Sequence, residues 1–175
     1  MKENVFTLYV QDPMGVKGDW FRLPMTEEEL KGKLETLFKG GDFIIASTLD
    51  DRGFNINEYS NLKELNQIAH EILEVGVDFQ ELEIVGSYEI YSPTELLQKV
   101  LDRDFIIIYP NPDTCSYVGS EEALGETLYE EGLLDINLPE DLIDLGYIYF
   151  EAVGRNEAIN KGWKYNKEHG AWVRA

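Results

Sequence analysis

Three glutamates at four-residue intervals, Glu122, Glu126 and Glu130, form the most regular set of reactive side chains in the sequence. At this spacing they lie on one face of an α-helix. Each like-charge pair four residues apart destabilises a helix by roughly 0.2–0.5 kcal/mol, so the two pairs cost up to about 1 kcal/mol. Such a row can bind Lys and Arg side chains of a partner. The simpler interpretation is a solvated helix face that tolerates the repulsion.

The stretch Gly119–Glu157, which contains these glutamates, is strongly acidic and yet patterned for folding. It holds eleven acidic residues and one basic residue, Arg155, for a net charge of −10. Its Leu, Ile, Tyr and Phe residues recur at helical spacing, which is not typical of a disordered acidic tail. Ser120 can cap a helix whose core-facing side carries Leu124 and Leu128. We therefore expect a folded scaffold that fixes many carboxylates at its surface.

The other side chains that could do chemistry are few. His70 lies on a predicted helix at the spacing for a surface pair with Asn66 or Glu74, and His169 falls in a predicted turn. Cys115 is the single cysteine, so no internal disulfide can form, and no neighbouring base activates it as a nucleophile. No two Cys or His residues stand at zinc spacing. We expect no catalytic residue, no cofactor and no metal site.

Two loops lack the residues that a ligand site needs. Gly15 and Gly18 do not form a phosphate-binding loop, because no Lys-Ser/Thr pair follows and no helix opens there. Asp50 and Asp51 lack the regular oxygen ligands of a calcium loop. A hydrolase that uses two carboxylates is the weakest alternative, since 34 acidic residues always place some pair close together.

Composition limits the class of protein. The chain has 175 residues, 43% of them hydrophobic and 12% aromatic, enough for a folded core. Its net charge of −19 disfavours nucleic acid and anionic membranes as ligands and favours a cationic partner, which could itself be a DNA-binding protein. The N-terminal sequence lacks the apolar run of a signal peptide, and no apolar span of 18 residues exists. These features predict a cytoplasmic protein.

The charge is unevenly distributed along the chain. Residues 1–39 carry a net charge of −1, residues 40–104 carry −10, and residues 158–175 carry +3. A uniform adaptation to high salt would have acidified the ends as well. The pattern therefore indicates an acidic body with less charged flanks. The elements expected along the chain group into three small domains.

The first domain, residues 1–59, is predicted to be an α+β unit with an antiparallel sheet. Thr26 and Glu29 form a capping box that opens a helix running to about Phe38. The expected strands lie at residues 5–10, 20–23 and 43–49.

The second domain, residues 60–103, is predicted to be an acidic helical bundle. Its first helix has an apolar stripe from Leu62 to Leu73, and a weaker helix opens at Asp78. Ser92 and Glu95 form a second capping box, with proline at the first helical position. The exposed acids expected here are Glu64, Glu71, Glu74, Glu81 and Glu83.

The third domain, residues 104–175, is predicted to be an acidic α+β unit. It starts with a buried strand at 105–109, and the helix capped by Ser120 follows. Two further helices are expected from Pro139 to about Gly146 and from Tyr147 to about Asn160. A terminal hairpin covers residues 163–174.

Three stretches, in this order, resemble the ArdA family of antirestriction proteins. They are LYVQDPMGVKGDWFRLP, NEYSNLKELNQI and GSEEALGETLYEEGLLDINLPEDLIDLGYIYFEAVGRNEAI. The last is similar to the family's acidic stretch leading into Tyr-x-Asp-Tyr-x-Ala-x-Gly-Arg-Asp. Two acids of that motif are replaced here by Tyr149 and Asn156. Glu151 and Arg155 either form an ion pair on one helix or contact a partner.

The resemblance implies an elongated, three-domain, homodimeric mimic of B-form DNA. Such a protein occupies the DNA-binding channel of type I restriction–modification enzymes, on their methyltransferase core, and is not an enzyme. The third domain is expected to form the dimer contact, and the protein to protect mobile genetic elements. On this hypothesis the partner-facing side chains are Glu122, Glu126, Glu130, Glu131, Asp135, Glu140, Asp141, Asp144 and Glu151. The alternative is an acidic interaction module for another basic, DNA-binding partner, such as a regulator, relaxase or histone-like protein.

Overall fold

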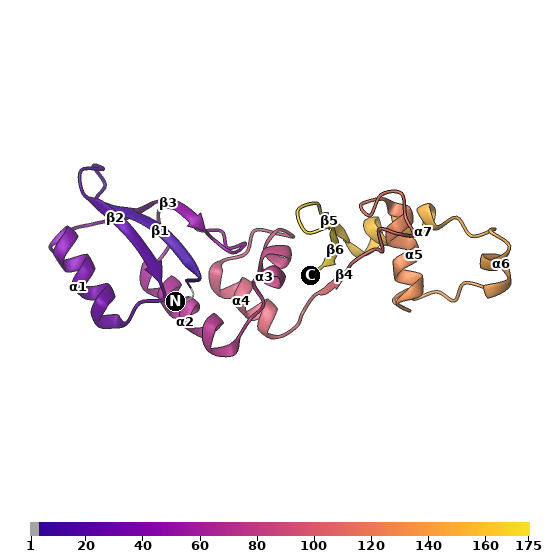
Figure 1. Cartoon of the computed structure of the whole chain (residues 1–175), viewed down its shortest axis with the longest axis horizontal. Coiled ribbons are helices and arrows are strands. Elements are labelled where there is room, and N and C mark those ends of the chain that lie inside the picture. Colours follow the sequence, from indigo (N-terminus) through magenta and orange to yellow (C-terminus); the bar gives the residue numbers. More distant parts are fainter. Residues whose placement is uncertain (1–3) are drawn as a thin grey trace. The chain divides into compact units, whose positions relative to one another are not determined.

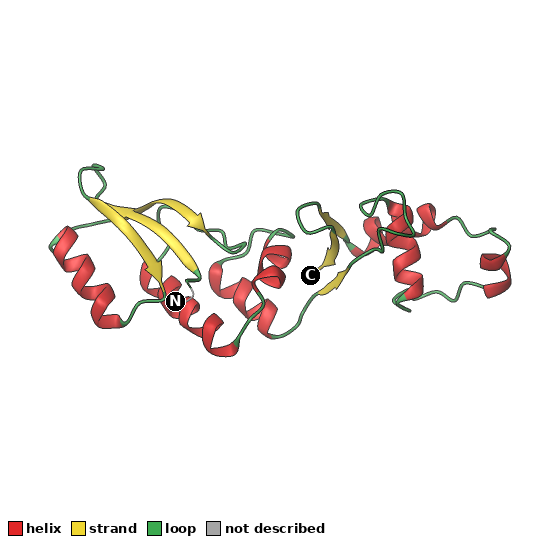
Figure 2. Cartoon of the chain, in the orientation of Figure 1, coloured by secondary structure: helices red, strands yellow, loops and turns green. Residues whose placement is uncertain are grey.

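A computed structural model of the chain describes residues 4–175 and shows a mixed α+β fold. Within these residues there are seven α-helices and two three-stranded antiparallel sheets (Figures 1 and 2). The predicted α+β class is therefore confirmed. The chain separates into two compact units, Met1–Asp102 and Arg103–Ala175. The finer division into domains 1–59, 60–103 and 104–175 stays a prediction.

The sheet of the first unit has the strand order β2-β1-β3. Its strands are β1 (Phe6–Gln11), β2 (Gly18–Leu23) and β3 (Ile44–Asp50). The antiparallel register of β1 and β2 continues until Gln11 pairs with Gly18, so β2 begins two residues earlier than the predicted strand. Phe6, Leu8 and Val10 are fully buried, as the two-residue period of a strand requires for a core-facing side.

Four helices complete the first unit. They are α1 (Glu27–Phe38), α2 (Leu62–Val75), α3 (Phe79–Gly86) and α4 (Pro93–Leu101). Both predicted capping boxes are present, because Thr26 and Ser92 accept from the amides of Glu29 and Glu95 and each glutamate accepts in return. The predicted apolar stripe of α2 is one residue too long, since Leu73 is 36% exposed. The helix leaves the core at its last turn.

The second unit combines three helices with a small sheet of strand order β4-β6-β5. The elements are β4 (Ile106–Ile108), α5 (Glu121–Glu130), α6 (Glu140–Asp144), α7 (Phe150–Lys161), β5 (Lys164–Asn166) and β6 (Ala171–Arg174). The terminal hairpin predicted at 163–174 is confirmed as β5 and β6. Of the strand predicted at 105–109, only Ile108 is buried, so the expectation of a fully buried strand was wrong.

The last helix begins three residues later than predicted. Gly146, at φ +71°, follows α6, and Tyr147 to Tyr149 connect it to α7, which starts at Phe150. Tyr149 is the N-cap residue of α7, but its side chain makes no capping hydrogen bond. In the part of the chain that the structure describes, no helix has the length and apolar character needed to cross a membrane.

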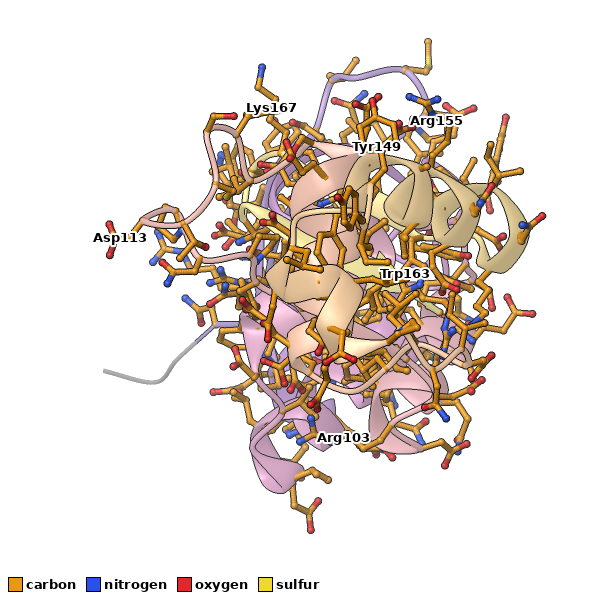
Figure 3. All side chains as sticks on the ribbon, turned by 90° about the vertical axis from the view of Figure 1, so that its right-hand side faces the viewer. Arg103, Asp113, Tyr149, Arg155, Trp163 and Lys167 are labelled. Carbon is orange, nitrogen blue, oxygen red and sulfur yellow. The ribbon has the colours of Figure 1, made fainter. Side chains whose placement is uncertain are left out.

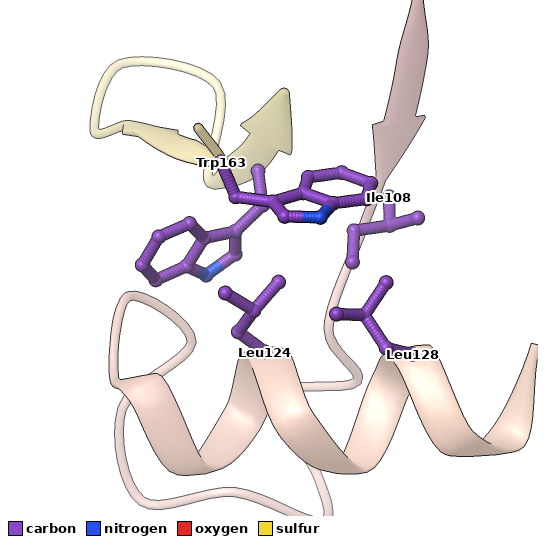
Figure 4. Close-up of a cluster of buried hydrophobic side chains, with 5 residues drawn as sticks. Ile108, Leu124, Leu128 and Trp163 are labelled. Atoms are coloured by element: carbon purple, nitrogen blue, oxygen red, sulfur yellow. The ribbon is translucent and has the colours of Figure 1, made fainter. Parts of the chain in front are cut away.

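The core of the second unit lies between α5 and the sheet. Leu124 and Leu128 point from one side of α5 toward Ile108 and Trp163, as Figure 4 shows. Trp172 of β6 completes this cluster, and its indole nitrogen donates to the carbonyl oxygen of Val118 at 3.0 Å. The cluster fixes which side of α5 faces the interior, and hence which side faces solvent.

Candidate partner-binding surface

Helix α5 presents the row of glutamates because its opposite side is buried. Ser120 caps the helix by accepting a hydrogen bond from the amide of Ala123 at 3.1 Å. The buried residues of the helix are Ala123, Leu124, Gly125, Thr127 and Leu128. With this side fixed against the core and α7, Glu122, Glu126 and Glu130 share the other side, as the four-residue spacing predicts.

The three glutamates differ in their environment. Glu122 and Glu130 are exposed, whereas Glu126 between them is half-buried. Burial raises the pKa of Glu126, and the negative charges of Glu122 and Glu130 raise it further. The repulsion expected from the sequence is therefore present in the folded chain. No other residue among 4–175 relieves it, because none of the three carboxylates is in an ion pair there.

Asp135, in the loop after α5, is exposed but already has a cationic partner. Its Oδ2 lies 2.6 Å from Nζ of Lys161, and the same ammonium lies 3.1 Å from Oε1 of Glu157. The hydrogen bond from Lys161 lowers the pKa of Asp135. Its role as a partner-facing residue stays a prediction, and it would have to exchange this lysine for a residue of the partner.

Arg155 connects α7 to α5 through two carboxylates. Its Nε donates to Oε2 of Glu121 at 2.8 Å, and its Nη2 donates to Oε1 of Glu151 on the preceding turn of α7. The hydroxyl of Tyr149 donates to the other oxygen of Glu151, which raises the pKa of Tyr149. Figure 3 shows Tyr149 and Arg155 beside each other at the surface. Of the two interpretations of Glu151 and Arg155, the intrahelical ion pair is thus confirmed.

The remaining predicted partner-facing acids are exposed. None of them is in an ion pair within residues 4–175. They are Glu131, which follows α5, and Glu140, Asp141 and Asp144 on α6. Together with the row on α5, seven of the nine predicted carboxylates are therefore available to a cationic partner.

The acids predicted to be exposed in the helices of the first unit are less uniform. Glu74 and Glu64 are exposed, and Oε1 of Glu64 accepts from the hydroxyl of Thr94 at 2.6 Å. Glu71 and Glu81 are half-buried. Glu83 lies 3.3 Å from Nη1 of Arg52, so part of this charge is compensated within the fold.

The other candidate reactive groups have structural contacts. His70 Nε2 lies 2.9 Å from the carbonyl oxygen of Met25, which Asn66 also binds at 2.9 Å, so the predicted surface pair with Asn66 or Glu74 was wrong. Cys115 donates through Sγ to the carbonyl oxygen of Asn111 at 3.1 Å. Within residues 4–175, no group of three or more His, Cys, Asp or Glu residues could hold a metal ion.

Sequence reasoning missed the ion pairs that join distant residues. Lys161 stands 26 residues from Asp135, and Arg155 stands 34 residues from Glu121, so no local pattern connects them. The only signal in the sequence was the scarcity of basic residues in the stretch around Arg155. Arg155 is the only base between Gly119 and Glu157, and a lone cation in such a stretch will be bonded to carboxylates.

The fold and this surface define an acidic α+β protein that exposes many carboxylates without ion-pair partners among the described residues. A sequence model of the family described as antirestriction protein (ArdA) matches residues 15–171. Because the match covers most of the chain, the protein belongs to the ArdA family of antirestriction proteins. These proteins are non-enzymatic inhibitors, so the chain inhibits restriction enzymes and is not itself an enzyme. A comparison with curated proteins found no match.

Proposed function

We propose that the protein inhibits type I restriction–modification enzymes by occupying their DNA-binding channel in place of DNA. A protein that binds DNA offers Lys and Arg side chains to phosphates, and carboxylates on a rigid surface can bind the same groups. Most of the affinity for duplex DNA is electrostatic and independent of sequence. A mimic therefore needs no bases, and it can act on enzymes of different sequence specificity.

The observation that carries this proposal is the row Glu122, Glu126 and Glu130. Burial raises the pKa of Glu126, and repulsion from Glu122 and Glu130 raises it further. The fold nevertheless holds the three carboxylates together without a compensating cation among the described residues. A surface selected only for stability would place Lys at one of these positions. An unpaired row of charge is instead suited to a partner that brings its own cations.

The total charge agrees with the size of a DNA site. A homodimer, which the family resemblance implies, would carry a charge of −38, twice the −19 of one chain. Duplex DNA carries one negative charge per about 1.7 Å of helix axis, which is two charges per base pair. A charge of −38 therefore corresponds to about 19 base pairs. In this proposal the protein is elongated, as a track of that length requires, and three small domains form the track.

Replacing the three glutamates by glutamine tests the proposal. We expect the variant Glu122→Gln, Glu126→Gln, Glu130→Gln to bind a purified type I methyltransferase about tenfold or more weakly at low salt, with a shallower dependence on salt. The matched control is Glu27→Gln, Glu28→Gln, Glu35→Gln on α1, which also changes the net charge to −16. All three control residues are exposed. Binding by the α5 variant as tight as that of the unaltered protein would show that this face of α5 is not the contact.

A pull-down from a host extract separates the proposal from its alternative. The intact protein should retain a type I enzyme, and DNA should release that enzyme competitively. Retention of a regulator, relaxase or histone-like protein without any type I enzyme would identify the protein as a different acidic interaction module.

A further inference from the structure

The loop between β1 and β2 carries two strongly exposed apolar side chains. Met14 is 87% exposed and Val16 is 75% exposed. Figure 1 shows this loop extending beyond the ends of the two strands. Single exposed apolar residues are ordinary, but two of them within three positions of one projecting loop form a local apolar surface.

The loop is held in one conformation by its own backbone and by Asp12. The carboxylate of Asp12 accepts hydrogen bonds from the amides of Val16 at 2.8 Å and Lys17 at 3.1 Å. The amide of Asp12 donates to the carbonyl oxygen of Lys17 at 2.8 Å, and that of Gly15 donates to Asp12 at 2.9 Å. Gly15 has φ +70°, which a glycine adopts without strain. Little conformational entropy is then lost when the tip binds a partner.

Aromatic side chains lie next to this loop on the sheet. Tyr9 and Trp20 are cross-strand partners whose ring centroids are 5.2 Å apart, and Trp20 is 37% exposed. A Cβ on Gly18 would stand 2.8 Å from the hydroxyl oxygen of Tyr9, so this ring lies across the base of the loop. Trp, Tyr and Met are enriched at the centres of protein–protein interfaces.

Two basic side chains beside the loop have a charge opposite in sign to that of the carboxylate surface. Lys17 and Arg22 are exposed, and neither is in an ion pair within residues 4–175. Asp19 is already paired with Lys33 at 2.9 Å, and Asp12 is bonded to the loop amides. Lys17 and Arg22 therefore present cationic groups without an ion-pair partner among these residues, beside apolar side chains, and a cationic group cannot imitate a phosphate.

We propose that this hairpin is a second contact site, which recognises protein and not a DNA-binding channel. Its partner is an apolar pocket bordered by carboxylates on the type I enzyme, outside the basic channel. The inference rests on the proposed function for the identity of that enzyme. The apolar tip fills the pocket and Lys17 pairs with its border, which distinguishes the true target from other cationic proteins.

Truncation of the apolar tip is the first test. The variant Met14→Ser, Val16→Ser should bind the purified methyltransferase about tenfold more weakly, with an unchanged slope of affinity against salt. The matched control is Leu49→Ser, Ile90→Ser, because these residues of the same unit are 68% and 86% exposed. The control should bind as the unaltered protein does. If the two double variants bind equally well, the hairpin is not a contact site.

Reversal of the charge at Lys17 is the second test. The direction of the resulting change in affinity discriminates between contact with a basic channel and contact with a carboxylate-bordered pocket. Lys17→Glu adds negative charge, which should leave binding to a basic channel unchanged or strengthen it. Contact with a carboxylate-bordered pocket predicts that the same variant binds several-fold more weakly. Tighter or unaltered binding by Lys17→Glu would overturn this inference and leave the proposed function intact. Failure of the unaltered protein to bind would instead overturn the proposed function, and this inference with it.

Discussion

Gly125 of α5 and Gly154 of α7 face each other where the two helices cross, and neither has room for a side chain. A Cβ on Gly154 would stand 1.7 Å from the carbonyl oxygen of Glu121 and 2.8 Å from the amide nitrogen of Gly125. A Cβ on Gly125 would stand 2.3 Å from the carbonyl oxygen of Phe150. The neighbouring atoms belong to backbone, so they cannot rotate away. The close approach brings Arg155 within reach of Glu121 on α5.

The first prediction concerns this crossing. Gly154→Ala should destabilise the protein by about 3 kcal/mol or more, because the added methyl group forces the helices apart. The control is Gly32→Ala in α1, where a Cβ would meet no atom within 4 Å. That variant should stabilise the protein by about 0.4–1 kcal/mol. Urea denaturation measures both free energies of unfolding. A tolerated alanine at position 154 would show that the helices do not approach this closely.

The helix crossing illustrates what could be predicted from the sequence and what could not. Thr26, Ser92 and Ser120 were recognised as caps because a cap depends on residues only three positions away. The glycine of the Gly-Arg motif was matched to the family, but its reason depends on Gly125, which is far away in the sequence. Close packing between helices leaves no local signal.

The carboxylate surface was likewise predictable only in part. The row on α5 followed from one helical period, and the structure places its members on one side of that helix. The ion pairs of Asp135 and Glu121 depend on the fold of the whole second unit, so the sequence could not separate paired from unpaired acids. The start of α7 was predicted too early, because Tyr147 and Tyr149 are exposed and carry no capping signal.

The second prediction uses the pH dependence of stability to distinguish Glu126, which has no ion-pair partner among residues 4–175, from Asp135, which is paired with Lys161. Because the pKa of Glu126 is raised in the folded state, the folded chain binds more protons than the unfolded chain just above the ordinary glutamate value of about 4.3. This contribution to stability therefore falls as pH rises through that window. Glu126→Gln should stabilise the protein at pH 7 by less than about 1 kcal/mol, and this gain should disappear in acid.

Asp135→Asn is the matched comparison, with the opposite sign. The pKa of Asp135 is lowered by Lys161, so its contribution is present above the unfolded pKa and is lost as pH falls through the folded one. This variant should be less stable than the unaltered protein at pH 7 and equal to it in strong acid. Thermal unfolding as a function of pH measures both variants. A shift of the same sign at pH 7 would contradict the assignment of the two environments.

The third prediction concerns the two positions where the family motif has Asp. Tyr149 is the N-cap of α7 and provides no capping hydrogen bond, so Tyr149→Asp should stabilise the protein, because a capping carboxylate outweighs the lost hydrogen bond from the Tyr149 hydroxyl to Glu151. Asn156→Asp adds the same charge at an exposed position within the helix and should leave the unfolding free energy nearly unchanged. On the proposed function, each variant should steepen the salt dependence of binding. Equal stability of both variants would show that the motif's first Asp has no capping role.

The fourth prediction concerns the dimer. Several large apolar side chains of the second unit are strongly exposed, among them Leu145 at 67%, Tyr147 at 74% and Ile159 at 73%. Exposed apolar side chains of this kind favour a symmetric contact between two copies. The protein, at 20.1 kDa per chain, should therefore sediment as a particle of about twice that mass. Leu145→Asp should shift it toward monomer, because the contact would bury an unpaired charge.

Ile90→Asp provides the control for the dimer, since Ile90 is 86% exposed in the first unit and lies outside the proposed contact. Analytical ultracentrifugation measures the mass of both variants after circular dichroism has shown that their helix content is unchanged. Because both variants replace an exposed apolar residue by Asp, a difference between them reflects the position of the residue. A dimer lost only in Leu145→Asp assigns the contact to the second unit. Loss in Ile90→Asp alone would move the contact to the first unit. A monomer in the unaltered protein would halve the available charge, and one chain would then match only about half of the 19 base pairs.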